Sequence, residues 1–481
     1  MTIANCATTG LEVFQATDDA PWNRDRIMHL FRRAGYGATP EQINLALMEG
    51  MEATVDRLLD EAINQPKREQ PEWAFWDYDA LIARQIAPFD LYREWSQGFM
   101  REALNNGVRE KLELFWQNHF VTTYESHSCP SYYYQYTDLI ATHAFGDFER
   151  FVGDVGRNPA MLAFLNGFQN TRQNPNENYA RELFELFTLG ENNGYTQQDI
   201  VEASRALTGW NGWTSYCGPV EWASWGYDPG NKTVFGRTGT WNYRSLIKIL
   251  FEERAPQIAR FIAEKLYRYY VNASIDEATV AGMAQTFQYN DFQIAPVLRQ
   301  LWKSAHFYDE AHVGALIKSP MDLITTWARE GNLGDFGNYY DWGFFAMANM
   351  GQYLGEPPDV AGWQGDRAWI DSNRLALRWE VMDGFAWAQY NEQNNIYVEF
   401  ARELTNNSDS ADEIARAMVD YFIPRGLLTE AAYENAVDAF KWEVPENYYS
   451  NGVWSLDYPT SNWQFVLLMR HIGRMPEFQL T

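Results

Sequence analysis

Apolar residues recur along most of this chain at the three- and four-residue spacing of amphipathic helices. Residues 256–271 show the pattern most plainly, since one helical face over this range would hold Ile258, Phe261, Ile262, Leu266 and Tyr269. Similar patterns occur near residues 41–64, 101–120, 148–156, 177–190, 198–209, 276–305 and 411–441. This spacing predicts a mainly α, multi-helical fold.

Capping residues mark several of the expected helix starts. A small polar residue followed by proline, or by an acid three positions on, can satisfy the free amides of a first turn. Such starts are predicted at Asn158-Pro159, Asn174-Pro175, Thr196 to Asp199 and Ser319-Pro320. Asp199 is therefore interpreted as a capping acid rather than a catalytic group.

Two long stretches interrupt the helical pattern. Residues 210–245 are rich in tryptophan and glycine, and residues 351–371 contain too much proline and glycine for a helix interior. A β-hairpin around Thr233 to Trp241 is the most strand-like segment. The expected fold is thus multi-helical, with long aromatic, Gly- and Pro-rich loops and at most one small hairpin.

The expected organisation is an N-terminal extension over residues 1–27 and one large helical domain over residues 28–481. No repeat of fixed period divides the chain. A C-terminal helical subdomain starting near residue 400 stays open as an alternative, because Asn-rich sequence precedes the last helical segments.

The net charge and the number of cysteines limit which partners and which cellular environment are expected. The formal net charge is −26, which opposes binding to nucleic acid or to anionic membranes, and no apolar run is long enough to span a bilayer. Cys6, Cys129 and Cys217 are odd in number and lack a CxxC spacing, so neither a disulfide framework nor a cysteine zinc site is expected. Residues 1–20 lack the features of a secretory signal, which indicates either a cytoplasmic protein or a mature exported form.

An ordered set of motifs identifies a family resemblance. The segments are residues 29–40 (HLFRRAGYGATP), 115–120 (FWQNHF), 176–183 (NENYAREL), 187–190 (FTLG), 194–196 (GYT), 205–210 (RALTGW), 317–320 (IKSP), 357–363 (PPDVAGW) and 476–478 (PEF). In this order they resemble the bacterial family called domain of unknown function 1800.

The resemblance implies a largely helical fold but no agreed activity. Members of that family are often exported and are often encoded beside a sulfatase-like protein, so the resemblance favours a periplasmic or secreted location. Many members carry a His-Asp pair between an aromatic Asp-Pro and a following lysine. Here residues 227–232 (YDPGNK) are shorter and contain no histidine.

The helix expected over residues 177–187 supplies the main catalytic candidates. Its polar face would carry Glu177, Arg181 and Glu182, and His119 closes the FWQNHF motif. Two carboxylates and an arginine in one cleft suit acid/base cleavage of glycosidic bonds. The alternatives are a solvated face of ion pairs on that helix and a hydrogen-bonded structural histidine.

Further polar and aromatic motif residues are expected to bind substrate. These are Asn118, Asn178, Arg205, Trp210, Asp359 and Trp363. Arg205 could instead pair with Glu202 one turn away, and tryptophans also anchor long loops to a core. No metal ligands are assigned and no cofactor is identified.

Three functional hypotheses follow. The first is an acid/base enzyme, a hydrolase of carbohydrate-like or other polar substrates, working in a cleft lined by the Glu/Arg helix face and the Trp-rich loops. The second is a non-catalytic binding or assembly partner of a sulfatase-like protein. The third is a metal-dependent enzyme that uses His119 with carboxylates, although no HExxH or paired-histidine spacing supports it.

Overall fold

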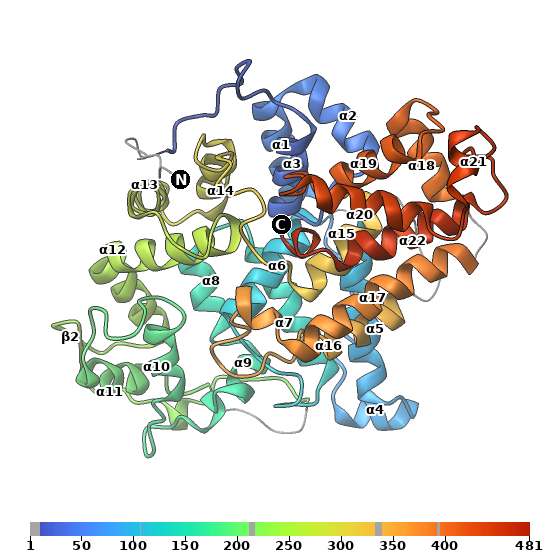
Figure 1. Ribbon diagram of the computed structural model, residues 1–481. Helices are drawn as coiled ribbons and strands as arrows, with labels where there is room; N and C mark the ends of the chain where they lie inside the picture. The colour runs from blue at the N-terminus through green and yellow to red at the C-terminus, as the bar shows by residue number, and fades with distance from the viewer. Residues whose placement is uncertain (1–9, 106, 211–216, 332–338, 392–394) are drawn as a thin grey trace. The chain divides into compact units, whose positions relative to one another are not determined.

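Helices form almost all of the regular structure in the computed structural model of the protein (Figure 1). The structure describes residues 10–105, 107–210, 217–331, 339–391 and 395–481. The mainly α fold with one small hairpin is confirmed. Contacts divide the chain into two compact units, of which the first comprises residues 1–15, 52–307 and 353–364, and the second comprises the remainder. The expected domain boundaries stay a prediction.

The first unit contains the helices of the middle of the chain. They are α3 (Met51–Asn64), α4 (Tyr78–Arg84), α5 (Pro88–Asn105), α6 (Val108–His119), α7 (Pro130–His143), α8 (Phe148–Val155), α9 (Pro159–Phe164), η1 (Gly167–Gln169), α10 (Asn178–Glu185), α11 (Gln197–Ala206), η2 (Ser224–Gly226), α12 (Tyr243–Tyr270), α13 (Glu277–Tyr289) and α14 (Ile294–Lys303).

Local capping explains where several of these helices begin. Asn158 caps α9, and Thr196 and Asp199 form a reciprocal capping box at α11, as predicted. The start predicted at Asn174-Pro175 is wrong, because Asn174 pairs with Thr171 in a tight turn and α10 begins only at Asn178. Glycine or non-helical residues also split the long segments predicted near 41–64, 276–305 and 411–441 into two helices each.

The predicted hairpin consists of β1 (Lys232–Val234) and β2 (Arg237–Gly239), which pair antiparallel. Its two-residue turn places Phe235 and Gly236 at φ +50° and +80°, as a type I′ turn requires. The amide of Phe235 donates to Asp199 Oδ1 at 2.7 Å, so the acid that caps α11 also fixes this turn.

Helix α6 runs through the interior of the first unit. All of its residues except Asn118 are buried, and α5 and α7 pack beside it. Trp116 is fully buried, and its indole donates to the carbonyl of Ala144 at 2.9 Å. Charged residues on such a helix must lie in the interior as well, and this placement creates the sites described below.

A disulfide joins Cys129, at the start of α7, to Cys217, across 88 residues. The expectation of no disulfide was therefore wrong. An odd cysteine count does not exclude one bridge, and the fold brings together two cysteines whose spacing in sequence gives no sign of pairing. Cys6 lies outside the described residues.

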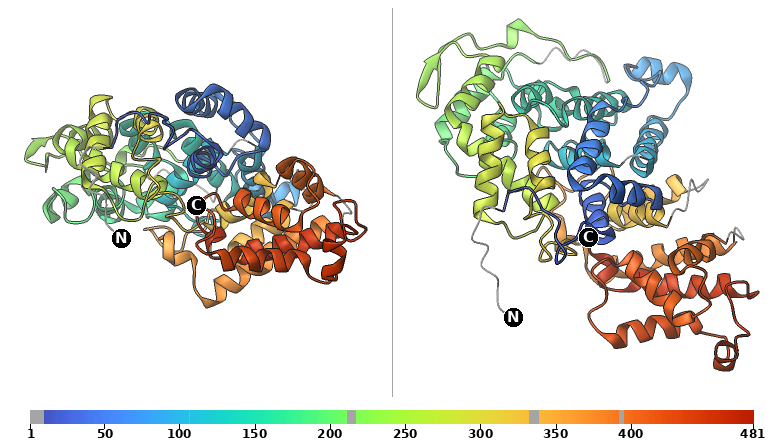
Figure 2. Two further views of the ribbon diagram at one scale, coloured as in Figure 1. Left: turned by 45° about the horizontal axis from the view of Figure 1, so that its top comes forward. Right: turned by 90° about the horizontal axis from the view of Figure 1, so that it is seen from above.

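The second unit contains helices from both ends of the chain. They are α1 (Arg24–Ala34), α2 (Pro40–Glu49), α15 (Pro320–Glu330), α16 (Tyr339–Asn349), η3 (Asp366–Trp369), α17 (Ser372–Asn391), α18 (Ile396–Thr405), α19 (Ala411–Phe422), α20 (Glu430–Lys441), α21 (Glu446–Ser450), α22 (Ser461–Arg474) and η4 (Glu477–Gln479). Helices α17 and α22 lie side by side, and α20 packs on α19 and α22 (Figure 2).

Buried charges hold the core of the second unit. Arg32 of α1 binds both carboxylate oxygens of Glu330, at the end of α15, at 2.6 Å each. The ammonium group of Lys318 is fully buried and donates to the carbonyl of Phe478 at 2.8 Å. Ser319 caps α15, as predicted. No helix among the described residues is both long enough and apolar enough to cross a membrane.

Candidate functional site

His119 ends α6 inside a shell of aromatic rings. Its side chain is 3% exposed, and the Phe120 ring lies 4.4 Å away between centroids. His119 Nε2 lies 3.0 Å from the carbonyl oxygen of Phe187, which can only accept, so Nε2 carries the proton. Burial lowers the pKa of His119 well below its usual range, and the positive charge of Lys265 lowers it further.

The second ring nitrogen of His119 faces Lys265 of α12. The distance from Lys265 Nζ to His119 Nδ1 is 3.1 Å, so the unprotonated nitrogen accepts from the lysine. Both nitrogens of His119 are therefore engaged. In this arrangement the one acceptor of His119 is directed at Lys265, a residue outside the motifs.

Asn118 holds the loop of the PPDVAGW motif. Its Oδ1 accepts from the backbone amide of Trp363 at 2.6 Å, and its Nδ2 donates to the backbone carbonyl of the same residue at 3.0 Å. A Cβ atom at Gly362 would collide with the Asn118 side chain. Trp363 is buried, whereas Asp359 is exposed and accepts from the amide of Ala361 in a local turn.

The polar face of α10 forms a chain of ion pairs. Arg181 binds Glu177 at 3.1 Å and Glu185 at 3.2 Å, which matches the salt-bridge interpretation of this face. Asn178 is exposed. The Glu182 carboxylate makes no hydrogen bond or ion pair to any described residue, and burial together with Glu185 raises the pKa of Glu182.

Arg205 is occupied by two carboxylates. It binds Asp228 at 2.7 Å and Glu202 at 2.8 Å. Asp228 lies in the shortened segment of residues 227–232, so this segment supplies a partner for the motif arginine. Trp210 meets Trp222 edge to face at 5.4 Å between centroids, within the part of the Trp-rich loop that the structure describes.

The predicted residues thus form pairs rather than one connected cluster of polar contacts. Asn118 contacts Trp363, and Glu177 contacts Arg181. Among the described residues, no hydrogen bond or ion pair joins His119 to Glu177, Glu182, Arg205 or Asp359. Their convergence on one concave site stays a prediction.

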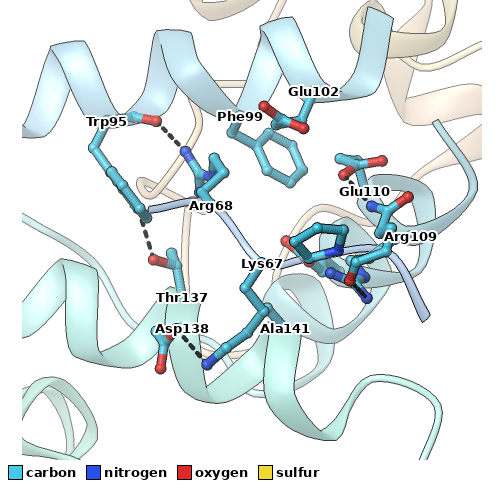
Figure 3. Close-up of a pocket in the computed structure, with 13 residues that line it drawn as sticks. Lys67, Arg68, Trp95, Phe99, Glu102, Arg109, Glu110, Thr137, Asp138 and Ala141 are labelled. Carbon is cyan, nitrogen blue, oxygen red and sulfur yellow. Dashed lines mark hydrogen bonds and ion pairs between the residues drawn. The ribbon is translucent and has the colours of Figure 1, made fainter. Parts of the chain in front are cut away.

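A pocket with a different set of charged residues lies in the first unit (Figure 3). Its walls come from residues 65–68 and from helices α5, α6 and α7. The space it encloses is small, enough for about one water molecule, so a larger ligand requires the lining side chains to move.

The pocket contains two buried carboxyl groups on α6 with different surroundings. Glu110 accepts from the amide of Gly107 at 3.0 Å and from Gln65 at 3.1 Å, and therefore caps the helix. Glu113 is 5% exposed and makes no hydrogen bond to any described residue. Burial raises the pKa of Glu113 to about 8, and the charge of Glu110 adds to the rise. Burial thus favours the protonated form of Glu113, against the lowering effect of Arg68 and Arg109.

Cations and aromatic rings complete the pocket. The Arg68 guanidinium lies 3.7 Å from the ring centroid of Trp95, and its Nη1 donates to the Trp95 carbonyl at 2.6 Å. Lys67 pairs with Asp138 at 2.6 Å (Figure 3). Glu102 of α5 also lines the pocket and has no hydrogen bond or ion pair to a described residue. The arrangement brings the Glu113 carboxyl into one pocket with the Glu102 carboxylate.

Sequence analysis missed Glu113, although a signal was present. Glu113 lies one turn before Trp116 and Gln117 on the stripe that an aromatic-rich helix buries. An acid at such a position must be buried, but the sequence does not indicate which side chains cover it. The described residues contain no group of three or more His, Cys, Asp or Glu side chains that could hold a metal ion.

Residues 29–480 match the family described as protein of unknown function (DUF1800). The chain belongs to the DUF1800 family. No curated protein and no solved structure matches it significantly.

Several of the DUF1800 motifs contact each other through hydrogen bonds. The FWQNHF and PPDVAGW motifs meet through Asn118 and Trp363, and the FTLG motif meets FWQNHF through the carbonyl of Phe187 and His119. In the second unit, the IKSP and PEF motifs meet through Lys318 and Phe478. The ordered DUF1800 motifs therefore mark contacts between distant parts of the chain.

Proposed function

We propose that this DUF1800 protein is an acid/base enzyme that hydrolyses a carbohydrate-like substrate, with Glu113 as the proton donor. The proposal rests mainly on one observation: the Glu113 carboxyl lines a pocket, is almost fully buried and has no hydrogen-bond partner among the described residues. Because the pKa of Glu113 is about 8, the group holds its proton at neutral pH and can release it to a substrate.

The proposed reaction is hydrolytic cleavage of a C–O bond. Glu113 gives its proton to the leaving oxygen as that bond breaks. Water adds to the carbon and loses a proton to Glu102, a partly exposed carboxylate that lines the pocket. Transfer of that proton back to Glu113 restores the starting state. A pair of carboxyl groups in different environments is the usual basis of such chemistry.

The rest of the pocket suits a polar substrate with apolar faces. The half-buried Trp95 ring, on the side that Arg68 does not cover, can pack against the C–H face of a sugar. Arg68 is held against Trp95, so its remaining N–H groups are oriented for hydroxyl or carboxylate oxygens.

The catalytic candidates predicted from the sequence are not the proton donor in this proposal. His119 has both ring nitrogens engaged, and Glu177 and Arg181 are paired with each other. Glu182 is the one α10 acid that remains a competing proton donor, since burial raises its pKa and it has no partner among the described residues. The experiment must therefore separate Glu113 from Glu182.

The test is hydrolysis of a panel of oligosaccharides, followed by chromatography of the products, with the full chain and matched variants. We expect Glu113→Gln to lower turnover by roughly 100-fold or more, because the shape is kept and the proton is lost. Glu182→Gln is the matched control and should retain activity.

A loss of activity in Glu182→Gln with an active Glu113→Gln would move the acid to α10 and overturn the assignment. Absence of cleavage across the panel, together with binding of a sulfatase-like protein that Glu113→Gln leaves unchanged, would favour the non-catalytic alternative.

A further inference from the structure

Lys265 is a lysine without a carboxylate partner. Among the described residues, no Asp or Glu oxygen lies within ion-pairing distance of its Nζ, which instead contacts His119 Nδ1 at 3.1 Å and the carbonyl of Leu186 at 3.4 Å. The Phe261 ring lies 4.8 Å from the same nitrogen. The residue as a whole is partly exposed.

Two acids on helices α12 and α13 are paired with other cations. Glu264, its neighbour on α12, binds Arg268 at 3.4 Å. Glu277 of α13, which packs against α12, binds Arg260 at 2.7 Å. Helix α6 contributes His119, which is neutral. Neither of these acids pairs with the amine, and burial lowers the pKa of Lys265 to about 8.

The orientation of the His119 ring fixes which of its nitrogens faces Lys265. Because the Phe187 carbonyl fixes the proton on Nε2, the lone pair of Nδ1 is directed at the Lys265 amine. A neutral amine can donate one N–H to this lone pair and keep its own lone pair available for attack. His119 is thus a positioning residue for Lys265.

We infer that Lys265 is a nucleophilic amine that forms an imine with the carbonyl group of an aldehyde or ketone, such as the open-chain form of a reducing sugar. The nitrogen adds to the carbonyl carbon, and one N–H proton passes to the oxygen. Loss of this oxygen as water leaves the C=N bond, so no oxidant or reductant takes part. Desolvated lysines beside apolar side chains commonly have this reactivity.

The test uses the full wild-type chain, so that no variant has to fold. The protein is incubated with glycolaldehyde at a series of pH values, trapped with cyanoborohydride and mapped by peptide mass spectrometry. Lys248 of the same helix, whose side chain is 70% exposed, is the internal control. A pKa near 8 rather than 10.5 makes the neutral fraction at pH 7 on the order of 100-fold larger.

We expect Lys265 to be trapped well ahead of Lys248 at pH 7, with an inflection near pH 8. A Lys265 that stays unmodified, or that follows the pH profile of Lys248, would overturn the inference. A parallel reaction with acetic anhydride separates general reactivity from imine formation, and acetylation of Lys265 without trapping would overturn the imine assignment. Since the readout is chemical labelling, the result is independent of hydrolysis by the Glu113 pocket.

Discussion

The side-chain amide of Asn118 binds both backbone groups of Trp363, with its oxygen 2.6 Å from the amide nitrogen and its nitrogen 3.0 Å from the carbonyl oxygen. The end of α6 and the PPDVAGW loop are thereby fixed to each other across 245 residues. The backbone at Gly362, with φ +81°, passes too close to Asn118 for any side chain.

The contact predicts a specific stability loss. Asn118→Ala removes both hydrogen bonds and leaves backbone groups of Trp363 unpaired, which should lower the free energy of unfolding by about 1–3 kcal/mol. Asn118→Asp keeps the acceptor for the Trp363 amide and should lose less. Chemical denaturation monitored by tryptophan fluorescence measures both. Equal losses in the two variants would mean that the amide nitrogen, rather than the oxygen, supplies the stabilisation.

The raised pKa of Glu113 predicts a pH-dependent stability. Between pH 4.5 and about 8 the folded protein keeps a proton on Glu113 that the unfolded chain has released. The contribution of this group to stability is therefore complete below pH 4.5 and is lost as the pH rises through about 8. Its slope can reach roughly 1.4 kcal/mol per pH unit. Subtracting the unfolding curve of Glu113→Gln from that of the wild type should isolate this slope, and parallel curves would contradict it.

The bridge between Cys129 and Cys217 predicts a redox-dependent stability. Closing a loop of this length stabilises the folded state by roughly 4 kcal/mol, so reduction or Cys217→Ser should lower the unfolding midpoint markedly. Thiol titration of the denatured chain gives an independent check. We expect one free thiol before reduction and three after it, and three before reduction would show that the bridge does not form.

The buried pair of Arg32 and Glu330 predicts a large effect from a small change. Glu330→Gln leaves the arginine charge uncompensated in the core and should cost about 3–5 kcal/mol of unfolding free energy. Glu399→Gln, at the exposed pair with Arg402, serves as the control and should cost less than about 1 kcal/mol. Similar losses at both sites would show that solvent reaches Glu330.

Local patterns predicted much of the fold, and long-range pairing explains most of what they missed. The apolar spacing predicted a helix that starts at residue 256. The structure shows that α12 starts earlier, at Tyr243, and continues past Pro256 with a kink at Arg254. Proline is common in the first turn of a helix, so the part before it was not predicted. Asp199 was expected as a cap and is one. Its second role, as acceptor for the Phe235 amide, depends on a hairpin 36 residues away.

In the candidate sites, too, contacts within one helix could be predicted and contacts between distant residues could not. The sequence indicated that His119 is either a catalytic group or a hydrogen-bonded structural residue. Its partner Lys265 is 146 residues away, and the sequence of α12 gives no sign of the contact. The ion pairs of Arg181 with Glu177 and Glu185 follow from helical spacing alone and were anticipated as an alternative. Glu113 could be assigned to a buried stripe, yet only the packing of α5 and α7 against α6 makes it part of a pocket.

The buried cations of the second unit also affect the electrostatic character of the exterior. Among its described residues, five cationic side chains are buried beside the single buried carboxylate of Glu330; they are Arg32, Arg33, Lys318, Arg329 and Arg378. These cations are not at the surface to pair with its acids, so fewer surface acids of the second unit have a cationic neighbour than composition alone indicates. The formal charge of −26 still sets the long-range field, which repels polyanions most strongly at low ionic strength.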